Sequence, residues 1–179
     1  VNSSANPVLS IRKEGNTPAW GAVYEQYFQE IDKVKGQKGV LSVEKKLFVE
    51  TNNGTNRQIR PVTPEQPLRI GDKVIVRLTI RTDREMNYVF LKDLRAGCFE
   101  PADQLSSPES RDGIWYYRSP KDVSENFFIN RLPEGTFVLE YPVYVSRSGE
   151  YAGGISTIQC MYAPEFVSHT AGESLRIMP

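Results

Sequence analysis

The sequence predicts an all-β fold: an antiparallel β-sandwich of two sheets that carries a short N-terminal β appendage. Apolar and polar residues alternate wherever a pattern is legible, which is the period of half-buried strands. Gly, Pro, Asn and Asp interrupt these runs at short intervals. Roughly ten short strands can be traced without a regular succession of strands and helices, and this pattern favours a two-sheet sandwich.

We expect the chain to divide at residue 66, with residues 1–66 as an N-terminal β segment and residues 67–179 as the sandwich. In the first segment, strands are predicted at 8–13, 20–27 and 40–49, separated by Gly, Asn or Pro. Residues 20–34 also carry apolar side chains at a helical period, so a helix is the alternative there.

The clearest strand covers residues 73–81, after the turn signal Gly71-Asp72. Four of its apolar side chains share one face, which is predicted to point into the core: Val74, Val76, Leu78 and Ile80. Residues 86–94 are the predicted partner strand, joined to it in a hairpin-like arrangement by the polar turn at 82–85.

Residues 102–113 are predicted as a surface loop, because their polar composition cannot bury apolar surface. Strands are then predicted at 114–117, 123–131, 136–147, 152–162 and 174–178. In the strand at 136–147, five apolar side chains share one face: Phe137, Leu139, Tyr141, Val143 and Val145. Pro142 lacks the N–H that a strand interior needs, so it predicts a sheet edge or a local irregularity.

Composition excludes two classes of partner. The 22 Lys and Arg residues balance the 22 Asp and Glu residues, so the chain lacks the basic excess expected of a protein that binds nucleic acid. Its apolar runs are far shorter than the roughly 20 residues that cross a bilayer. We therefore expect no nucleic acid and no membrane-spanning segment.

The chain has two cysteines, Cys98 and Cys160, without the close spacing of a zinc site. One interpretation is two separate buried thiols that behave as small apolar residues. The alternative is a disulfide between two strand ends, which would require an oxidising compartment.

No catalytic constellation is legible, so we expect a non-enzyme without cofactor or metal. The single histidine, His169, rules out a multi-histidine site within this chain and is predicted at the surface. Asp93 and Glu100 flank a turn and could in principle act as an acid–base pair. An aspartate before a turn more commonly caps backbone N–H groups, and this is the interpretation that we favour.

Several motifs in the C-terminal half give a more specific indication. Gly71 to Val76 is followed by a strand that runs through Asp93 into a turn motif, which ends in Gly97-Cys-Phe99-Glu100-Pro101. Three further motifs follow in order: Asp-Val-Ser-Glu-Asn-Phe-Phe from 122, Leu-Pro-Glu-Gly-Thr-Phe from 132, and Gly-Ile-Ser-Thr-Ile-Gln-Cys-Met-Tyr-Ala-Pro-Glu-Phe from 154. This succession resembles the C-terminal macroglobulin-like (MG10-type) domain of bacterial α2-macroglobulins.

The resemblance implies one domain of a protease trap. In this family a target protease cleaves an exposed bait region, the molecule rearranges, and a reactive thioester captures the protease. The thioester pairs a Cys with a Gln three residues later, a spacing that neither Cys98 nor Cys160 has. The implied partners are therefore the thioester domain of a parent chain and its target proteases. The implied location is the periplasm or the bacterial cell envelope.

The family's last domain carries a Met-Tyr pair that packs against the thioester and shields it from water, and Met161-Tyr162 matches that pair. Equally, these two residues could simply end a core strand. At the other end, Trp-Gly-Ala-Val-Tyr at 20–24 resembles strands that return from the helical thioester domain. Residues 1–66 are accordingly implied to return from an upstream domain.

A second function class remains open, a stand-alone binding module such as an adhesin or a carbohydrate-binding sandwich. Trp115, Tyr116 and Tyr117 would form its platform, although cross-strand packing is the simpler interpretation of the three rings. Rings exposed in a row would favour this class, whereas an apolar patch near Met161 and Tyr162 would favour the trap.

Overall fold

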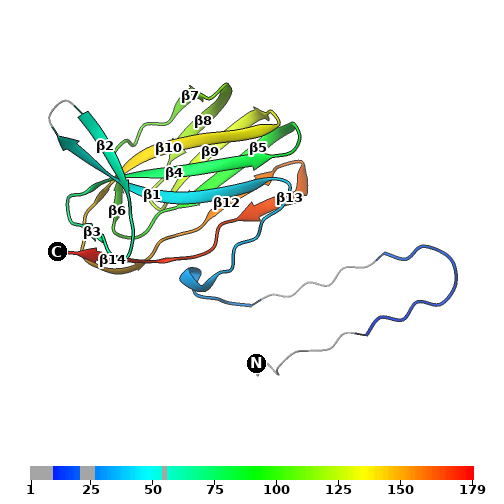
Figure 1. Cartoon of the computed structure of the whole chain (residues 1–179). Helices are drawn as coiled ribbons and strands as arrows, with labels where there is room; N and C mark the ends of the chain where they lie inside the picture. Colours follow the sequence, from blue (N-terminus) through cyan, green and yellow to red (C-terminus); the bar gives the residue numbers. More distant parts are fainter. Residues whose placement is uncertain (1–9, 21–26, 54–55) are drawn as a thin grey trace.

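The computed structural model describes residues 10–20, 27–53 and 56–179, and their side chains except those of residues 52, 53, 56 and 57. Two antiparallel sheets face each other in it (Figure 1). The first sheet has the strand order β2-β1-β4-β10-β6. Its strands are β1 (Ser42–Asn53), β2 (Asn56–Pro61), β4 (Lys73–Thr82), β6 (Phe99–Pro101) and β10 (Gly135–Val145). The predicted all-β sandwich is thus confirmed.

The second sheet has the order β13-β12-β5-β9-β8-β7. Its strands are β5 (Met86–Leu94), β7 (Ser107–Arg111), β8 (Ile114–Pro120), β9 (Ser124–Leu132), β12 (Ser156–Cys160) and β13 (Ala163–His169). A small third sheet, β11-β14-β3, lies at one end of the sandwich, and its pair β14–β3 is parallel. It contains β3 (Leu68–Arg69), β11 (Gly149–Ala152) and β14 (Ser174–Met178). The 3₁₀ turn η1 (Ile31–Lys33) precedes β1.

The core lies between the two large sheets, where the alternating side chains of β4 and β10 point inward as predicted. The inward residues of β10 are all buried, and β4 and β10 pair with Leu78 opposite Leu139. Each fully buried Leu or Ile contributes roughly 1.5–3 kcal/mol of transfer free energy. Pro142 lies where β10 forms an edge, because β6 pairs only with Val143 to Val145.

The predicted hairpin between 73–81 and 86–94 is wrong. β4 pairs with β1 and β10, whereas β5 pairs with β9 and β12 in the opposite sheet. The turn between them therefore carries the chain across the core. Alternation tells which face of a strand is buried but not which sheet the strand joins, so the sequence pattern could not separate a hairpin from a crossover.

Two other boundaries differ from the predictions. The predicted loop at 102–113 contains β7, an edge strand in which no residue is buried, so its sequence lacks the apolar alternation of a core strand. The predicted strand at 152–162 is interrupted by Gly153 and Gly154, and the chain passes from β11 in the small sheet to β12 in the second sheet. Gly154 has φ +75°, a conformation that ends regular pairing.

The N-terminal part is less regular than predicted. Of the strand expected at 8–13, residues 10–13 have no regular structure. Of the strand expected at 20–27, or the alternative helix at 20–34, residues 21–26 lie outside the described residues. β1, by contrast, pairs with β4 from Ser42 to Glu50. The sandwich therefore includes β1 and β2, which the division at residue 66 assigned to the N-terminal segment.

Residues 31–39, which we call the N-terminal strap, lie along the loop between β13 and β14. Gln37 forms a two-way backbone bridge with His169, and the Gly172 N–H donates to the Val34 carbonyl. A Cβ at position 172 would meet the Ile31 carbonyl oxygen at 1.9 Å, so the close approach of the strap requires glycine there.

Candidate functional site

The turn between β12 and β13 exposes two large apolar side chains. Met161 is 51% exposed and Tyr162 is 79% exposed. We call this turn, residues 161–162, the tip. Turns of soluble domains usually carry polar residues, and adjacent exposed apolar side chains are typical of a surface that another molecule covers. The alternative that Met161 and Tyr162 simply end a core strand does not fit their exposure.

The tip is held by Tyr88 of β5, a residue that the sequence did not single out. The Met161 N–H donates to the Tyr88 carbonyl at 2.9 Å. The Tyr88 and Tyr162 rings meet edge to face, with centroids 5.1 Å apart. The strand pairing between β5 and β12 ends at Val89 and Cys160, so the tip lies directly beyond the last paired residues.

The outward face of the second sheet carries a group of aromatic residues that we call the outer-face aromatics: Phe90, Trp115, Tyr117 and Phe128. Tyr117 pairs with Phe128, and Phe128 pairs with Phe90, so three rings cross three neighbouring strands in one row. The Phe90 and Phe128 rings stack with centroids 4.9 Å apart. Trp115 is 71% exposed on the same face.

The predicted three-ring platform is incorrect for Tyr116. Its side chain points to the opposite face, is 6% exposed and donates from its hydroxyl to Glu109 at 3.0 Å. Burial, followed by the neighbouring Glu109 carboxylate, raises the pKa of Tyr116 to about 12. Only Trp115 and Tyr117 of the three lie outside.

Asp93 of the family turn motif is fully buried and accepts hydrogen bonds from side chains. Lys45 donates to its Oδ1 at 2.8 Å, Ser156 donates to the same oxygen at 2.8 Å, and the Tyr141 hydroxyl donates to Oδ2. The prediction that Asp93 caps backbone N–H groups is therefore wrong. Burial, followed by the negative charge of Asp93, raises the pKa of Tyr141 well above its usual value.

The other motif residues surround the start of β6. Glu100 is exposed and pairs with Tyr144, so it forms no acid–base pair with the buried Asp93. Phe99 is part of the core, and Pro101 ends the pairing with β10. A Cβ at Gly97 would make ordinary contact with the Tyr151 ring. Apart from the exposed Glu100 carboxylate, these residues build the fold.

A second buried ionic cluster lies near Asp93. The Glu125 carboxylate accepts from Arg95 at 3.0 Å and from Arg118 at 2.8 Å, and all three residues are buried. Burial raises the pKa of Glu125, while the two guanidinium groups act in the opposite direction. Because both arginines are occupied within the core, this cluster has no access to a substrate.

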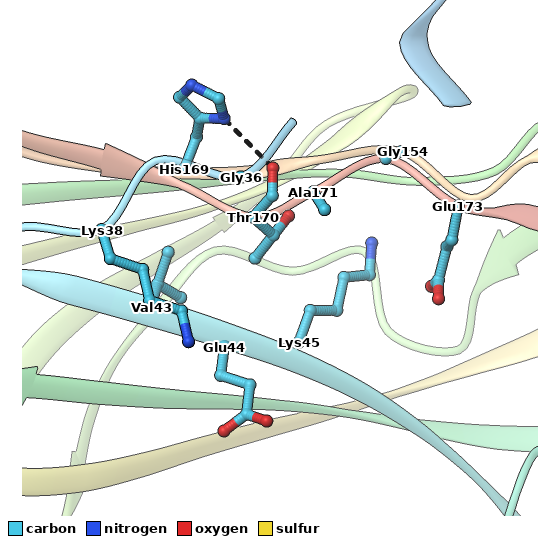
Figure 2. A pocket seen from close by; sticks show the side chains of 11 residues that line it. Gly36, Lys38, Val43, Glu44, Lys45, Gly154, His169, Thr170, Ala171 and Glu173 are labelled. Atoms are coloured by element: carbon cyan, nitrogen blue, oxygen red, sulfur yellow. Dashed lines mark hydrogen bonds between the residues drawn. The ribbon is translucent and has the colours of Figure 1, made fainter. Parts of the chain in front are cut away.

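Figure 2 shows a pocket between the N-terminal strap, β1 and the loop that follows β13. His169, predicted at the surface, is half-buried there, and its Nδ1 lies 3.1 Å from the Thr170 carbonyl oxygen. The Lys45 ammonium lines the pocket but already donates to Asp93, Leu94 and Gly153. In the part of the chain that the structure describes, no group of three or more His, Cys, Asp or Glu side chains could hold a metal ion.

Cys98 and Cys160 are separate, buried thiols, which is the first of the two interpretations above. Cys98 precedes β6, whereas Cys160 ends β12 and its thiol donates to the Asn87 carbonyl at 3.2 Å. Burial raises the pKa of the Cys98 thiol to about 11.

The two thiols predict a labelling result. Protein purified without reductant from an oxidising compartment should show two reactive thiols per chain after unfolding, because no bridge joins them. In the folded protein at pH 8, Cys98 should alkylate far more slowly than a free thiol, since the thiolate is the nucleophile. Mass spectrometry after timed alkylation measures both values. No reactive thiol in the unfolded chain would show that a disulfide had formed.

Among residues 10–20, 27–53 and 56–179, no helix has the length and apolar character needed to cross a membrane.

Comparison with known proteins adds the family context. A family model described as "Bacterial Alpha-2-macroglobulin MG10 domain" matches residues 41–165. A structure of Salmonella α2-macroglobulin reacted with methylamine is 21% identical, with a TM-score of 0.62 over 81% of this chain and 10% of that chain. Native Escherichia coli α2-macroglobulin, solved from domain MG7 to the C-terminus, is 17% identical, with a TM-score of 0.62 over 80% of this chain and 24% of that chain.

A curated Dictyostelium discoideum protein, "Circularly permutated Ras protein 2", is 28% identical over 109 residues. That match covers 61% of this chain and 3% of the Dictyostelium protein. This chain thus spans only a small part of each protein that it resembles.

Proposed function

Because this chain belongs to the MG10 domain family of bacterial α2-macroglobulins, we propose that it is a non-catalytic C-terminal domain of a protease-trapping inhibitor. In this role it packs on the thioester domain of a longer parent chain and shields the thioester from water. The observation that carries the proposal is the exposed tip, where Met161 and Tyr162 present apolar surface that another domain would cover.

The chemistry of the tip suits this role. An acyl thioester hydrolyses wherever water reaches it, so its lifetime depends on a dry environment. Met161 supplies a flexible, polarizable side chain that fills irregular gaps, and Tyr162 supplies a broad ring. Together they make an adaptable apolar lid. The thioester itself would be contributed by the partner domain, because neither Cys98 nor Cys160 has a Gln three residues later.

The N-terminal segment supports a place in a longer chain. Trp20 and Tyr27 are 97% and 71% exposed, which leaves aromatic surface without a partner in the described residues. We propose that this segment returns from an upstream domain, which would cover both rings. A periplasmic or envelope-anchored location is part of the same proposal, since a protease trap must meet the proteases that it captures.

The outer-face aromatics favour a second candidate, a binding module. Trp115 and Tyr117 lie on one exposed face with Phe128, and such rings can stack on a planar ligand such as a sugar. This candidate explains the outer face but leaves the exposed tip without a role. The protease trap is therefore the function that we place first.

A protease-capture experiment on the parent chain tests the proposal. The parent is treated with a broad-specificity protease, and denaturing gels report the covalent adduct. Met161→Ala and Tyr162→Ala should lose most of the adduct, because water reaches the thioester before the protease does. Tyr144→Ala is the matched control, since Tyr144 is an aromatic residue of the opposite sheet with 45% exposure. It should retain the adduct.

Either of two results would count against the proposal. Full adduct yield in both tip variants would show that the tip shields nothing. Cleavage of the wild-type parent without any adduct would indicate a relative that lacks a working thioester, and would favour the binding-module candidate.

A further inference from the structure

Tyr88 has a backbone conformation that its sequence context does not explain. Its φ is +56°, and the other non-glycine residue with positive φ in the described chain is Asp112. Asp112 precedes Gly113 in the tight turn between β7 and β8, where an Asp-Gly pair with positive φ is expected. Tyr88 lies inside a strand, and a bulky residue in this region is a genuine outlier.

Tyr88 contacts both residues of the tip. Its carbonyl accepts the hydrogen bond from the Met161 N–H, and its ring rests edge to face against Tyr162. One hydrogen bond and one ring contact therefore join Tyr88 to both residues of the tip. Tyr88 is itself 51% exposed, so core packing does not account for its strained backbone. Strained residues persist where their surroundings hold them, commonly at functional sites.

We propose that Tyr88 is a positioning residue that fixes the Met161–Tyr162 tip in a single conformation before it meets its partner. That a partner needs the tip in one conformation rests on the proposed function above. A turn that is already ordered loses less conformational entropy on docking, so more of the contact free energy stabilises the packed interface with the partner domain.

The test uses two substitutions that separate the ring from the backbone. Tyr88→Asn removes the ring but keeps a residue that tolerates positive φ, and Tyr88→Phe keeps the ring. Amide hydrogen exchange of Met161 in this chain reports how often the tip opens, and the core amide of Leu91 reports global unfolding. Loss of an aromatic pair should make Met161 exchange roughly two- to tenfold faster in the Asn variant. The Phe variant should exchange as the wild type does, and Leu91 should not change in either.

The outcome that overturns the proposal is wild-type exchange of Met161 in both variants, because the ring would then contribute nothing to the tip. A second measurement separates this inference from the proposed function. In the parent chain, loss of protease adduct with Tyr88→Asn but not with Tyr88→Phe would connect positioning to shielding. Faster Met161 exchange with unchanged adduct yield would support the positioning role and contradict the shielding role.

Discussion

Asp93→Ala is expected to destabilise the domain by about 3–5 kcal/mol, because it leaves the buried Lys45 ammonium without its counterion. The Lys45 side chain is 4% exposed, and Asp93 is fully buried. Tyr141 and Ser156 lose the same acceptor. Since domains of this size are stable by only about 5–15 kcal/mol, the variant should lose a large fraction of the free energy of unfolding.

Urea denaturation followed by circular dichroism measures this loss. Glu100→Ala, which removes an exposed carboxylate from the same family motif, should change the free energy of unfolding by less than about 0.5 kcal/mol. A Lys45→Met, Asp93→Ala double variant should recover part of the stability, because it removes the Lys45 charge that Asp93→Ala leaves unpaired. An Asp93→Ala variant as stable as Glu100→Ala would show that the Lys45–Asp93 pair is not buried as described.

Gly154→Ala should also be strongly destabilising, with a loss of about 2–4 kcal/mol from backbone strain and overpacking. Gly154 has φ +75°, and a Cβ there would lie 2.2 Å from the Leu94 carbonyl oxygen. The chain cannot relieve this contact without moving β5 or the connection into β12.

Gly113→Ala is the matched control, because Gly113 has φ +82° and a Cβ added there would have no neighbouring atom within 4 Å. It should lose only about 1–2 kcal/mol, the cost of a side chain in the left-handed region. The difference in thermal or urea midpoint between the Gly154→Ala and Gly113→Ala variants measures the destabilisation caused by the contact with the Leu94 carbonyl. Equal losses in the two variants would contradict that close approach.

Much of the fold could be predicted because apolar residues recur at every second position of β4 and β10, although Ile75 on the other face of β4 is also buried. The same alternation places Lys45 and Asp93 at core-facing positions of their strands. Lys45 is in phase with Val43 and Leu47, and Asp93 is in phase with Val89 and Leu91. Opposite charges at core-facing positions of two predicted strands indicate a buried ion pair, and this signal is stronger than the nearby turn that suggested a cap.

Other features had no signal in a single sequence. The choice of sheet for β5 depends on contacts between strands distant in the chain, which alternation does not encode. No residue of β7 is buried, so the strand has the polar composition of a loop. Tyr88 has a positive φ and contacts the tip, and nothing in the local sequence favours that backbone conformation.

Site-specific photo-cross-linking in the parent chain tests whether the tip packs on the thioester domain. A photoreactive phenylalanine analogue replaces Tyr162 at the tip or Tyr117 among the outer-face aromatics, and mass spectrometry locates the cross-linked peptide. We expect position 162 to cross-link within the same chain, to the domain that carries the thioester, and protease treatment to abolish this cross-link. The absence of an intrachain product from position 162 would contradict the proposed packing of the tip on that domain.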